Sequence, residues 1–298
     1  MAMTETERYL FDLNGYLVVR GVLSEDEVQE INRVIDRAVP PSWDAEHDVK
    51  DIMVGFDLET TETDKAANPA YAPLNFYAGQ LLDWGKPIRN LVANEKILPY
   101  MIELIGPALR LDHQYVLLIK PNAPGQHLHG AGTPYDPMHY YHFKDNRFHN
   151  GLVTASYALT DVPPGKGGFC CIPGSHKSNL SRPRSIHDLR GEVPDCVVQV
   201  APRKGDVVLF TEALSHGTLP WKADFERRAV FFKYAAGHMQ CEQNSPFVSM
   251  DHDWDDVQQA LLRRPDYVDR TPVLESQSGP GLTPAKERER ASGSGPRA

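Results

Sequence analysis

Short runs of β-branched and aromatic residues, separated by turns rich in glycine and proline, fill most of the chain after residue 108. Strands are expected at residues 109–120, 152–159, 169–172, 196–200, 204–210 and 228–234. Successive short strands with no regular helix between them favour antiparallel sheets over alternating strand and helix units. We therefore predict a mainly β chain with helices (α+β), folded as a double-stranded β-helix or cupin-like jelly-roll barrel.

The beginning of the chain predicts a strand followed by a helix. Residues 16–22 (YLVVRGV) are rich in β-branched side chains and are expected to form the strand. Ser24 and Glu27 then have the spacing of a capping box, in which each side chain binds the backbone N–H of the other. The apolar positions that follow recur at helical spacing and should bury one face of the helix against the barrel: Val28, Ile31 and Ile35.

Further helices should support the barrel. Residues 86–104 have apolar positions suited to helices, and Pro99 should divide them into two. Another helix is expected at 254–263, whereas residues 42–72 are acidic and should be irregular. The chain is thus predicted to form one domain, residues 1–275, and residues 276–298 should be a disordered tail because they contain almost no core-forming side chains.

Composition excludes several classes of protein. The net charge of −9 and the pI near 5.7 argue against a nucleic-acid polymer as partner, because polyanion binding needs a concentrated basic face. No apolar run approaches the roughly 20 residues of a membrane span. The first residues do not have the pattern of a secretory signal, and the four cysteines form no disulfide framework. These observations favour a cytoplasmic protein, and nothing in the sequence specifies its oligomeric state.

Two histidines stand out as candidate metal ligands. His129 lies in PGQHLHGAG and His216 in TEALSHGTLPW, and each follows an apolar run. They could converge across a sheet on one metal ion. A mononuclear non-haem iron(II) site uses two histidines and one carboxylate. Residues i and i+2 of a strand share a face, so the carboxylate is expected two residues after His129, where the chain has Ala131.

These motifs resemble the phytanoyl-CoA dioxygenase family of iron(II)/2-oxoglutarate oxygenases. The resemblance covers most of the chain from Phe11 to about Gly237. It is carried by FDLNGYLVVRGVLSEDEV, by LHGA where the family usually has His-x-Asp, by GGFCCIPGSHKSN and by HGTLPWKADFERRA.

The resemblance implies cofactors and roles for individual residues. The cofactors are Fe(II), 2-oxoglutarate and O2, and His129 and His216 hold the iron. An arginine about eleven residues after the distal histidine binds the far carboxylate of 2-oxoglutarate, and here that residue is Arg227, with Arg228 next to it. Thr218 stands where the family has a hydroxyl residue near the same cosubstrate.

The alanine at position 131 leaves three interpretations open. A small residue at this place resembles the halogenases among iron/2-oxoglutarate enzymes, in which chloride takes the vacant ligand position, and this predicts a chlorinating enzyme of specialised metabolism. In the second interpretation Asp136, His127 or a water molecule completes the metal site of a hydroxylase or dioxygenase. In the third, the chain is a binding protein without catalytic activity.

The substrate is expected to be a freestanding small molecule. Residues 127–149 have no clear period and are expected to form a long binding loop. Within it, Lys144 and Arg147 stand among aromatic rings, a composition that suits a phosphate and a stacked base, so a nucleotide is the first candidate. Three further residues of this loop are candidates for the substrate pocket: Tyr140, Tyr141 and His142.

Overall fold

The computed structural model describes residues 3–39, 75–78, 81–187, 189, 192–241 and 251–274, and for 75–78 it describes only the backbone. Two predictions fall outside these residues. They are the irregular stretch at 42–72 and the tail at 276–298.

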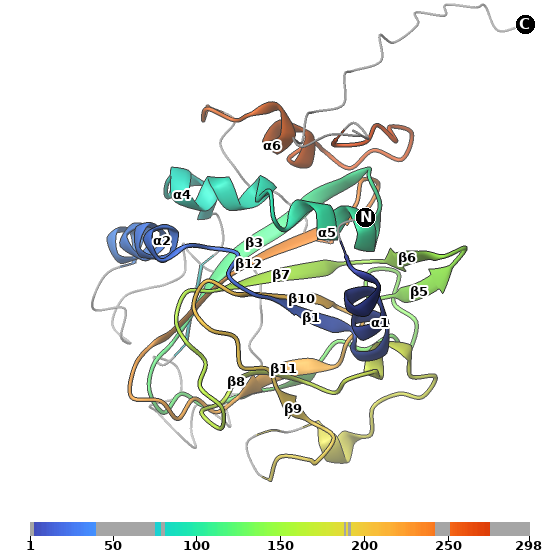
Figure 1. The fold of residues 1–298 in the computed structure, drawn as a ribbon. Coiled ribbons are helices and arrows are strands. Elements are labelled where there is room, and N and C mark those ends of the chain that lie inside the picture. The colour runs from blue at the N-terminus through green and yellow to red at the C-terminus, as the bar shows by residue number, and fades with distance from the viewer. Residues whose placement is uncertain are drawn as a thin grey trace, which may run out of the picture.

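Two antiparallel sheets form the body of the molecule (Figure 1). The larger one has the strand order β1 (Tyr16–Val19), β10 (Val207–Thr211), β7 (Val153–Ala158), β12 (Arg227–Ala236), β3 (Leu109–Ile119) and β2 (Asn75–Ala78). The smaller one has the order β4 (Gln126–His129), β11 (His216–Leu219), β8 (Gly168–Cys171) and β9 (Val198–Gln199). The predicted mainly β, antiparallel architecture is confirmed.

Strand β12 shows how alternation separates the two faces of the larger sheet. Val230, Phe232 and Tyr234 belong to the core that includes the helices, whereas Ala229 and Phe231 belong to a second core with Trp221. Successive side chains of a strand point to opposite faces. Arg227, at one end of β12, and Lys233, near the other end, therefore share the face of Ala229 and Phe231. Both cations therefore lie on the face that is turned away from the helices.

Helices cover the outer face of the larger sheet (Figure 1). They are α2 (Glu25–Ala38), α4 (Lys86–Arg89), α5 (Leu98–Ile105) and α6 (Asp256–Leu261), with 3-10 turns η3 (Leu81–Asp83) and η4 (Asn90–Ala93) between them. The Ser24–Glu27 capping box of α2 is confirmed. Pro99 does not itself divide a helix, because it lies in the first turn of α5, where a missing N–H costs no hydrogen bond.

An additional helix, α1 (Glu5–Asn14), precedes β1 and was not predicted. Thr4 and Glu7 form its capping box, and Gly15 ends it at φ 79°. Only one of its residues, Phe11, is fully buried, so the helix lacks the apolar stripe that helix prediction relies on. The capping pattern of Thr4 and Glu7 was the available signal.

The prediction of an irregular loop over residues 127–149 is wrong for its first three residues, which belong to β4, and for its second half. A hairpin stands there, made of β5 (Tyr141–Lys144) and β6 (Arg147–Asn150). Its two turn residues, Asp145 and Asn146, have φ of 52° and 58°, as a tight hairpin turn requires, and Asp and Asn tolerate this conformation better than most residues. Two short 3-10 turns complete the described elements: η5 (Ser175–Lys177) and η6 (Arg184–Ile186).

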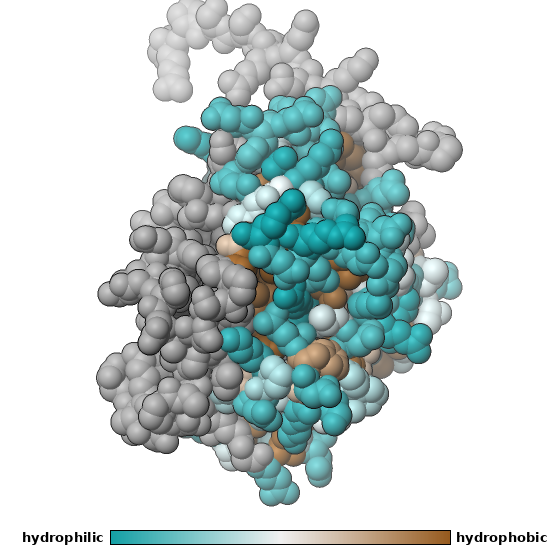
Figure 2. Space-filling view, turned by 90° about the vertical axis from the view of Figure 1, so that its left-hand side faces the viewer, coloured by the Kyte–Doolittle hydropathy of each residue, from teal (hydrophilic) through white to brown (hydrophobic). Residues whose placement is uncertain are grey.

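The surface is largely polar. In Figure 2 hydrophilic side chains cover most of the described face, and hydrophobic residues show mainly in gaps between them. Among the described residues, none of the helices has both the length and the apolar character needed to span a bilayer.

Candidate metal centre

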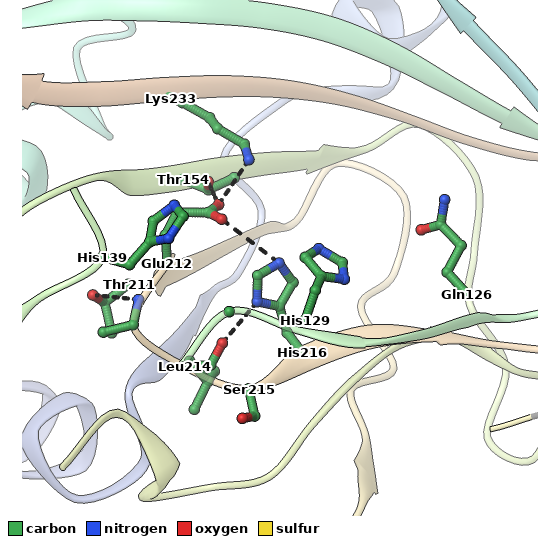
Figure 3. A network of polar contacts seen from close by, with 12 residues as sticks. Gln126, His129, His139, Thr154, Thr211, Glu212, Leu214, Ser215, His216 and Lys233 are labelled. Atoms are coloured by element: carbon green, nitrogen blue, oxygen red, sulfur yellow. Dashed lines mark hydrogen bonds and ion pairs between the residues drawn. The ribbon is translucent and has the colours of Figure 1, made fainter. Parts of the chain in front are cut away.

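The two candidate ligands stand side by side on neighbouring strands. His129 ends β4 and His216 begins β11, and the two residues are register partners with ring centroids 4.2 Å apart (Figure 3). The register shifts between His216 and Thr218, which pairs with Gln126. The Thr218 hydroxyl donates to the Gln126 side-chain oxygen at 3.3 Å. The convergence that the sequence suggests is thus present, and the role of the two histidines as ligands stays a prediction.

Backbone contacts set the orientation of the His216 ring. Its Nδ1 lies 2.8 Å from the carbonyl oxygen of Leu214, and since a carbonyl only accepts, Nδ1 carries the proton. Gly130 packs against this contact with φ 69°. A Cβ there would lie 2.6 Å from the carbonyl oxygens of Leu214 and Glu212. The glycine after His129 therefore lets β4 approach close to His216.

Both imidazoles are in a form that can bind a metal. Burial lowers the pKa of His216. Surrounding protein atoms also lower the pKa of His129 well below its usual range, with a further contribution from His216, although solvent still reaches the His129 ring. Metal binding requires neutral imidazole, and the hydrogen bond at Nδ1 of His216 leaves Nε2 available. These two side chains fit an iron(II) ion.

Glu212 is the residue that sequence reasoning missed. It directly follows β10 and is 3% exposed. One carboxylate oxygen, Oε2, lies 3.7 Å from Nε2 of His216. The other, Oε1, lies 3.0 Å from Nζ of Lys233 and accepts a hydrogen bond from the Thr154 hydroxyl (Figure 3). The available signal was a carboxylate standing alone in the apolar run VVLFTEAL.

The charges of Glu212 and Lys233 stabilise one another. Burial by itself would raise the pKa of Glu212, but the Lys233 cation holds it well below its usual range. Burial by itself would lower the pKa of Lys233, and the Glu212 carboxylate raises it instead. Both side chains are therefore charged inside the barrel, as expected for a buried pair.

The geometry distinguishes the two candidate arginines for the cosubstrate. Arg227 is 3% exposed and lies on the inner face of β12, where a Cβ at Gly168 would meet its Nε at 3.3 Å. Arg228 points to the other face and binds Asp36 and Glu226, each at 2.7 Å. Only Arg227 therefore faces the interior that also holds the buried Thr218.

Arg182 is a second residue that sequence reasoning missed. Its guanidinium donates to the carbonyl oxygens of Leu128 and Gly130, at 2.7 and 3.2 Å, and to the Ser215 hydroxyl at 2.7 Å. Leu128 and Gly130 flank His129, and Ser215 precedes His216. One side chain thus connects the backbone around both histidines.

A cleft of about 580 Å³ lies next to the segment that follows His129, and neither His129 nor His216 is among the residues that line it. Its wall includes Gly130 and Ala131, which directly follow His129. The polar groups in it come mainly from the loop after β4 and from the segment before η6: Thr133, Tyr135, Asp136, His139, Ser181 and Arg182. Ala131 has φ 140° and presents only a methyl group to this cleft.

The two alternative ligands named from the sequence have other partners. Asp136 accepts from the Met138 N–H at 2.8 Å and lies 3.2 Å from Nδ1 of His139. His127 packs against His187, with ring centroids 4.6 Å apart. Among the described residues, no three His, Cys, Asp or Glu side chains already stand as a complete metal-binding group.

The three aromatic candidates for the substrate pocket lie elsewhere. Tyr141 is buried, donates its hydroxyl to Asp12 of α1 and packs edge-on against His176. Tyr140 stacks on His142, which belongs to the exposed hairpin β5–β6. None of them lines the described cleft, because the hairpin turns this segment away from it.

Comparison with known proteins agrees with this architecture. The sequence profile of PhyH, phytanoyl-CoA dioxygenase, matches residues 11–229. The chain belongs to the phytanoyl-CoA dioxygenase family. Peroxisomal phytanoyl-CoA dioxygenase of Rattus norvegicus is 24% identical over 249 residues, which cover 77% of this chain and 68% of that protein. The Homo sapiens enzyme is 22% identical over 252 residues, 78% of this chain and 69% of that protein.

Solved structures share the fold. HygX from Streptomyces hygroscopicus, with nickel, 2-oxoglutarate and hygromycin B bound, is 23% identical, covers 80% of this chain and 89% of its own, and has a TM-score of 0.64. The α-ketoglutarate-dependent carbocyclase SnoK from nogalamycin biosynthesis is 20% identical, covers 82% and 89%, and has a TM-score of 0.55. The predicted jelly-roll fold and the predicted enzyme class, an iron(II)/2-oxoglutarate-dependent oxygenase-type oxidoreductase, are thereby confirmed.

Proposed function

We propose that this member of the family uses iron(II), 2-oxoglutarate and O2 to oxidise an unactivated C–H bond of a freestanding small molecule. The observation that carries the proposal is the pairing of His129 with His216 across β4 and β11, inside a barrel whose larger sheet turns Arg227 toward the same interior. HygX structures with iron or with nickel and 2-oxoglutarate support the choice of cofactors.

Each of these side chains has a chemical task. His129 and His216 hold the metal through neutral imidazole nitrogens. The Arg227 guanidinium would pair with the distal carboxylate of 2-oxoglutarate, and the Thr218 hydroxyl, which donates to Gln126 in this structure, would turn to donate to the same carboxylate. When bound, iron(II) with 2-oxoglutarate and O2 supplies the oxidising power, while the protein sets the distance and angle of the target C–H bond.

The cleft beside Ala131 suggests the class of substrate. Its volume of about 580 Å³ suits a ligand of drug-like size. The Asp136 carboxylate accepts hydrogen bonds from hydroxyl or ammonium groups, and Tyr135 offers an aromatic face. We therefore propose a small molecule that carries several hydroxyl or amino groups. HygX, bound to hygromycin B, supports this class.

A nucleotide has less support than the sequence suggested. That hypothesis was based on Lys144 and Arg147. These two exposed residues are register partners at the end of the hairpin β5–β6. Neither is among the residues that line the cleft. The nucleotide stays an untested prediction, and the polar cleft argues for a different ligand.

Chlorination of the same C–H bond is the second candidate reaction, and Ala131 favours it. A carboxylate and a halide are both anionic ligands that compete for one coordination position, so a methyl group at residue 131 leaves room for the halide. In this case the loop that follows Ala131 would position the substrate so that its target carbon takes up chloride.

The test is anaerobic reconstitution with Fe(II) and 2-oxoglutarate, followed by absorption spectroscopy of the complex and by measurement of succinate after O2 is added. The wild-type protein should form the complex and release succinate, and His216→Ala should do neither. His149→Ala, which changes an exposed histidine of the hairpin, is the matched control and should behave as wild type. A wild-type protein that binds neither iron nor 2-oxoglutarate would contradict the proposal.

The same preparation distinguishes the two reactions. Crystals soaked in bromide should show an anomalous-scattering peak within bonding distance of the metal if a halide takes the position beside Ala131. An enzyme that hydroxylates should instead show a protein carboxylate or a water molecule there.

A further inference from the structure

We infer that Glu212 is the carboxylate ligand of the metal and takes the role that Ala131 cannot fill. This inference rests on the proposed iron site. Glu212 lies four positions before the distal histidine, His216. The alternation of side chains along a strand does not relate Glu212 to His129.

Nε2 of His216 and Oε2 of Glu212 face each other. Since Nδ1 of His216 donates to Leu214, Nε2 of the neutral ring holds a lone pair. The atom opposite is Oε2 of Glu212, 3.7 Å away. This distance is too long for a hydrogen bond, and neither atom carries a hydrogen to share. Two acceptors that face each other in a buried site are stabilised by a cation between them.

The distance is close to that between two ligands of one ion. Nitrogen and oxygen ligands lie about 2.1 Å from a first-row divalent metal. Two such atoms on one ion are about 3.0 Å apart at an angle of 90° and about 3.4 Å apart at the tetrahedral angle. The separation of 3.7 Å between Nε2 of His216 and Oε2 of Glu212 is slightly longer, so a small movement of the Glu212 side chain would bring the two atoms to the spacing of ligands on a shared ion.

Two side chains support the other carboxylate oxygen of Glu212. Lys233 and Thr154 both bind Oε1, which leaves Oε2 turned toward His216 (Figure 3). Ligating carboxylates are commonly oriented by such hydrogen bonds on the oxygen that does not bind the metal. The Glu212 and Lys233 charges balance each other, and iron(II) balances doubly charged 2-oxoglutarate, so the Arg227 cation is the one remaining charge of this set.

His129 completes the set by a change of side-chain rotamer. The residue is exposed, and Nδ1 of its ring donates a hydrogen bond of 3.3 Å to the His127 carbonyl oxygen. Its centroid is already 4.2 Å from that of His216. Among the described residues, no three such side chains form a metal-binding group as they stand, so the proposed site requires the His129 ring to turn toward the other two. Metal binding would turn it.

The consequence is a choice between the two reactions. With Glu212 bound, the anionic position is occupied by the protein, so a halide has no vacant place. The proposed enzyme is then a hydroxylating oxygenase whose carboxylate comes from the larger sheet, and Ala131 serves as cleft wall.

The experiment measures metal affinity, not turnover. Metal-free full-length protein is titrated with Co(II) and with Fe(II) under argon, and the Co(II) absorption spectrum reports the ligand set. Glu212→Gln is combined with Lys233→Met so that no unpaired charge is buried. Loss of the lysine cation by itself would not weaken cation binding, so a lower affinity reports on the carboxylate. The paired variant should bind Co(II) at least about 100-fold more weakly.

A double-mutant cycle with Ala131→Asp distinguishes a ligand from a positioning residue. If Glu212 is a ligand, Ala131→Asp should restore Co(II) binding in the paired variant and change wild-type affinity little. Asp224→Asn, which removes an exposed carboxylate outside the cleft, is the control and should leave affinity unchanged. Glu212→Asp keeps the charge but shortens the side chain by one methylene group, so it should weaken Co(II) binding and shift the Co(II) spectrum. This single substitution provides the test if the paired variant folds poorly.

Two results would overturn the inference. One is a paired variant that is folded by circular dichroism and binds Co(II) like wild type. The other is an Ala131→Asp effect of equal size in both backgrounds, which would mean that Glu212 only positions His216. If wild type itself binds neither Co(II) nor Fe(II), the proposed metal site fails as a whole, and this outcome is distinct from the other two.

Discussion

Replacing Arg182 with lysine should loosen the backbone around both candidate metal ligands at once. The planar guanidinium reaches four places: the Leu128 carbonyl, the Gly130 carbonyl, the Ser215 hydroxyl and Nδ1 of His187. The single ammonium of lysine has no fork with which to bridge them. The substitution keeps the charge and therefore tests the geometry of the contact.

The magnitude follows from the contacts that are lost. A hydrogen bond from a charged donor contributes about 1.5 to 3 kcal/mol, and two of these contacts are 2.7 Å long. Lysine can keep one of the two. Because Arg182 is only half-buried, we expect a loss of about 2 kcal/mol in the free energy of unfolding. Metal affinity should fall by about 10-fold or more, as when other groups that orient ligands are removed.

Urea denaturation of the metal-free protein measures the first quantity, and Co(II) titration measures the second. Arg184→Lys, at an exposed position two residues further on, is the matched control and should change neither. A variant Arg182→Lys that is less stable as expected but binds Co(II) with wild-type affinity would refute a role of Arg182 in positioning the two histidines. In that case Arg182 would support the loop without positioning the histidines.

Three further substitutions test separate parts of the structure. Arg227→Lys should raise the KM for 2-oxoglutarate by about 10-fold or more through loss of the bidentate contact, whereas Arg228→Lys should not; equal effects in steady-state assays would argue against Arg227 as the clamp. Gly130→Ala should lower the free energy of unfolding by about 2 to 4 kcal/mol, because the new Cβ would lie 2.6 Å from two carbonyl oxygens and the residue has φ 69°. Gly165→Ala, at φ 76° with open space around it, measures the cost of the positive φ without a steric clash. Equal losses for the two variants in urea denaturation would show that the clash at Gly130 contributes nothing. Burial lowers the pKa of His176 to about 4, against about 6.5 in the unfolded chain. Above pH 6.5 the ring is neutral in both states, so its contribution to the free energy of unfolding is fully present. As the pH falls to 4, the unfolded chain takes up the proton first and the free energy of unfolding should decrease by about 3 kcal/mol. His176→Gln should reduce this acid-dependent loss in denaturation at pH 7 and pH 4.5, and an unchanged loss would assign the effect to other groups.

Local patterns predicted elements wherever one period or one cap dominated. The Ser24–Glu27 capping box with its apolar positions predicted α2, and the β-branched runs predicted β3, β7, β10 and β12. Two elements with weak patterns were missed. Helix α1 buries only Phe11 fully, and the strands of the hairpin β5–β6 are largely polar because one of their faces meets solvent.

The candidate site was only partly accessible from the sequence. His129 and His216 were proposed from two short motifs, and Thr218 and Arg227 from the resemblance to the family; the roles of all four stay predictions. Glu212, Lys233 and Arg182 were missed because their partners lie on other elements. Lys233 in particular looks like any strand lysine in RAVFFKY, and only the alternation of β12 shows that it points inward.

The sequence by itself determined the antiparallel strands and the absence of a carboxylate at position 131, because these follow from residue type and from short-range periodicity. The tertiary structure decided which side chains meet. The register shift between His216 and Thr218 sets His129 opposite His216, and the packing of one sheet over the other brings the carboxylate of Glu212 toward the same place. Such contacts depend on strand register and on the facing of two sheets, and neither is encoded within any one segment of the chain.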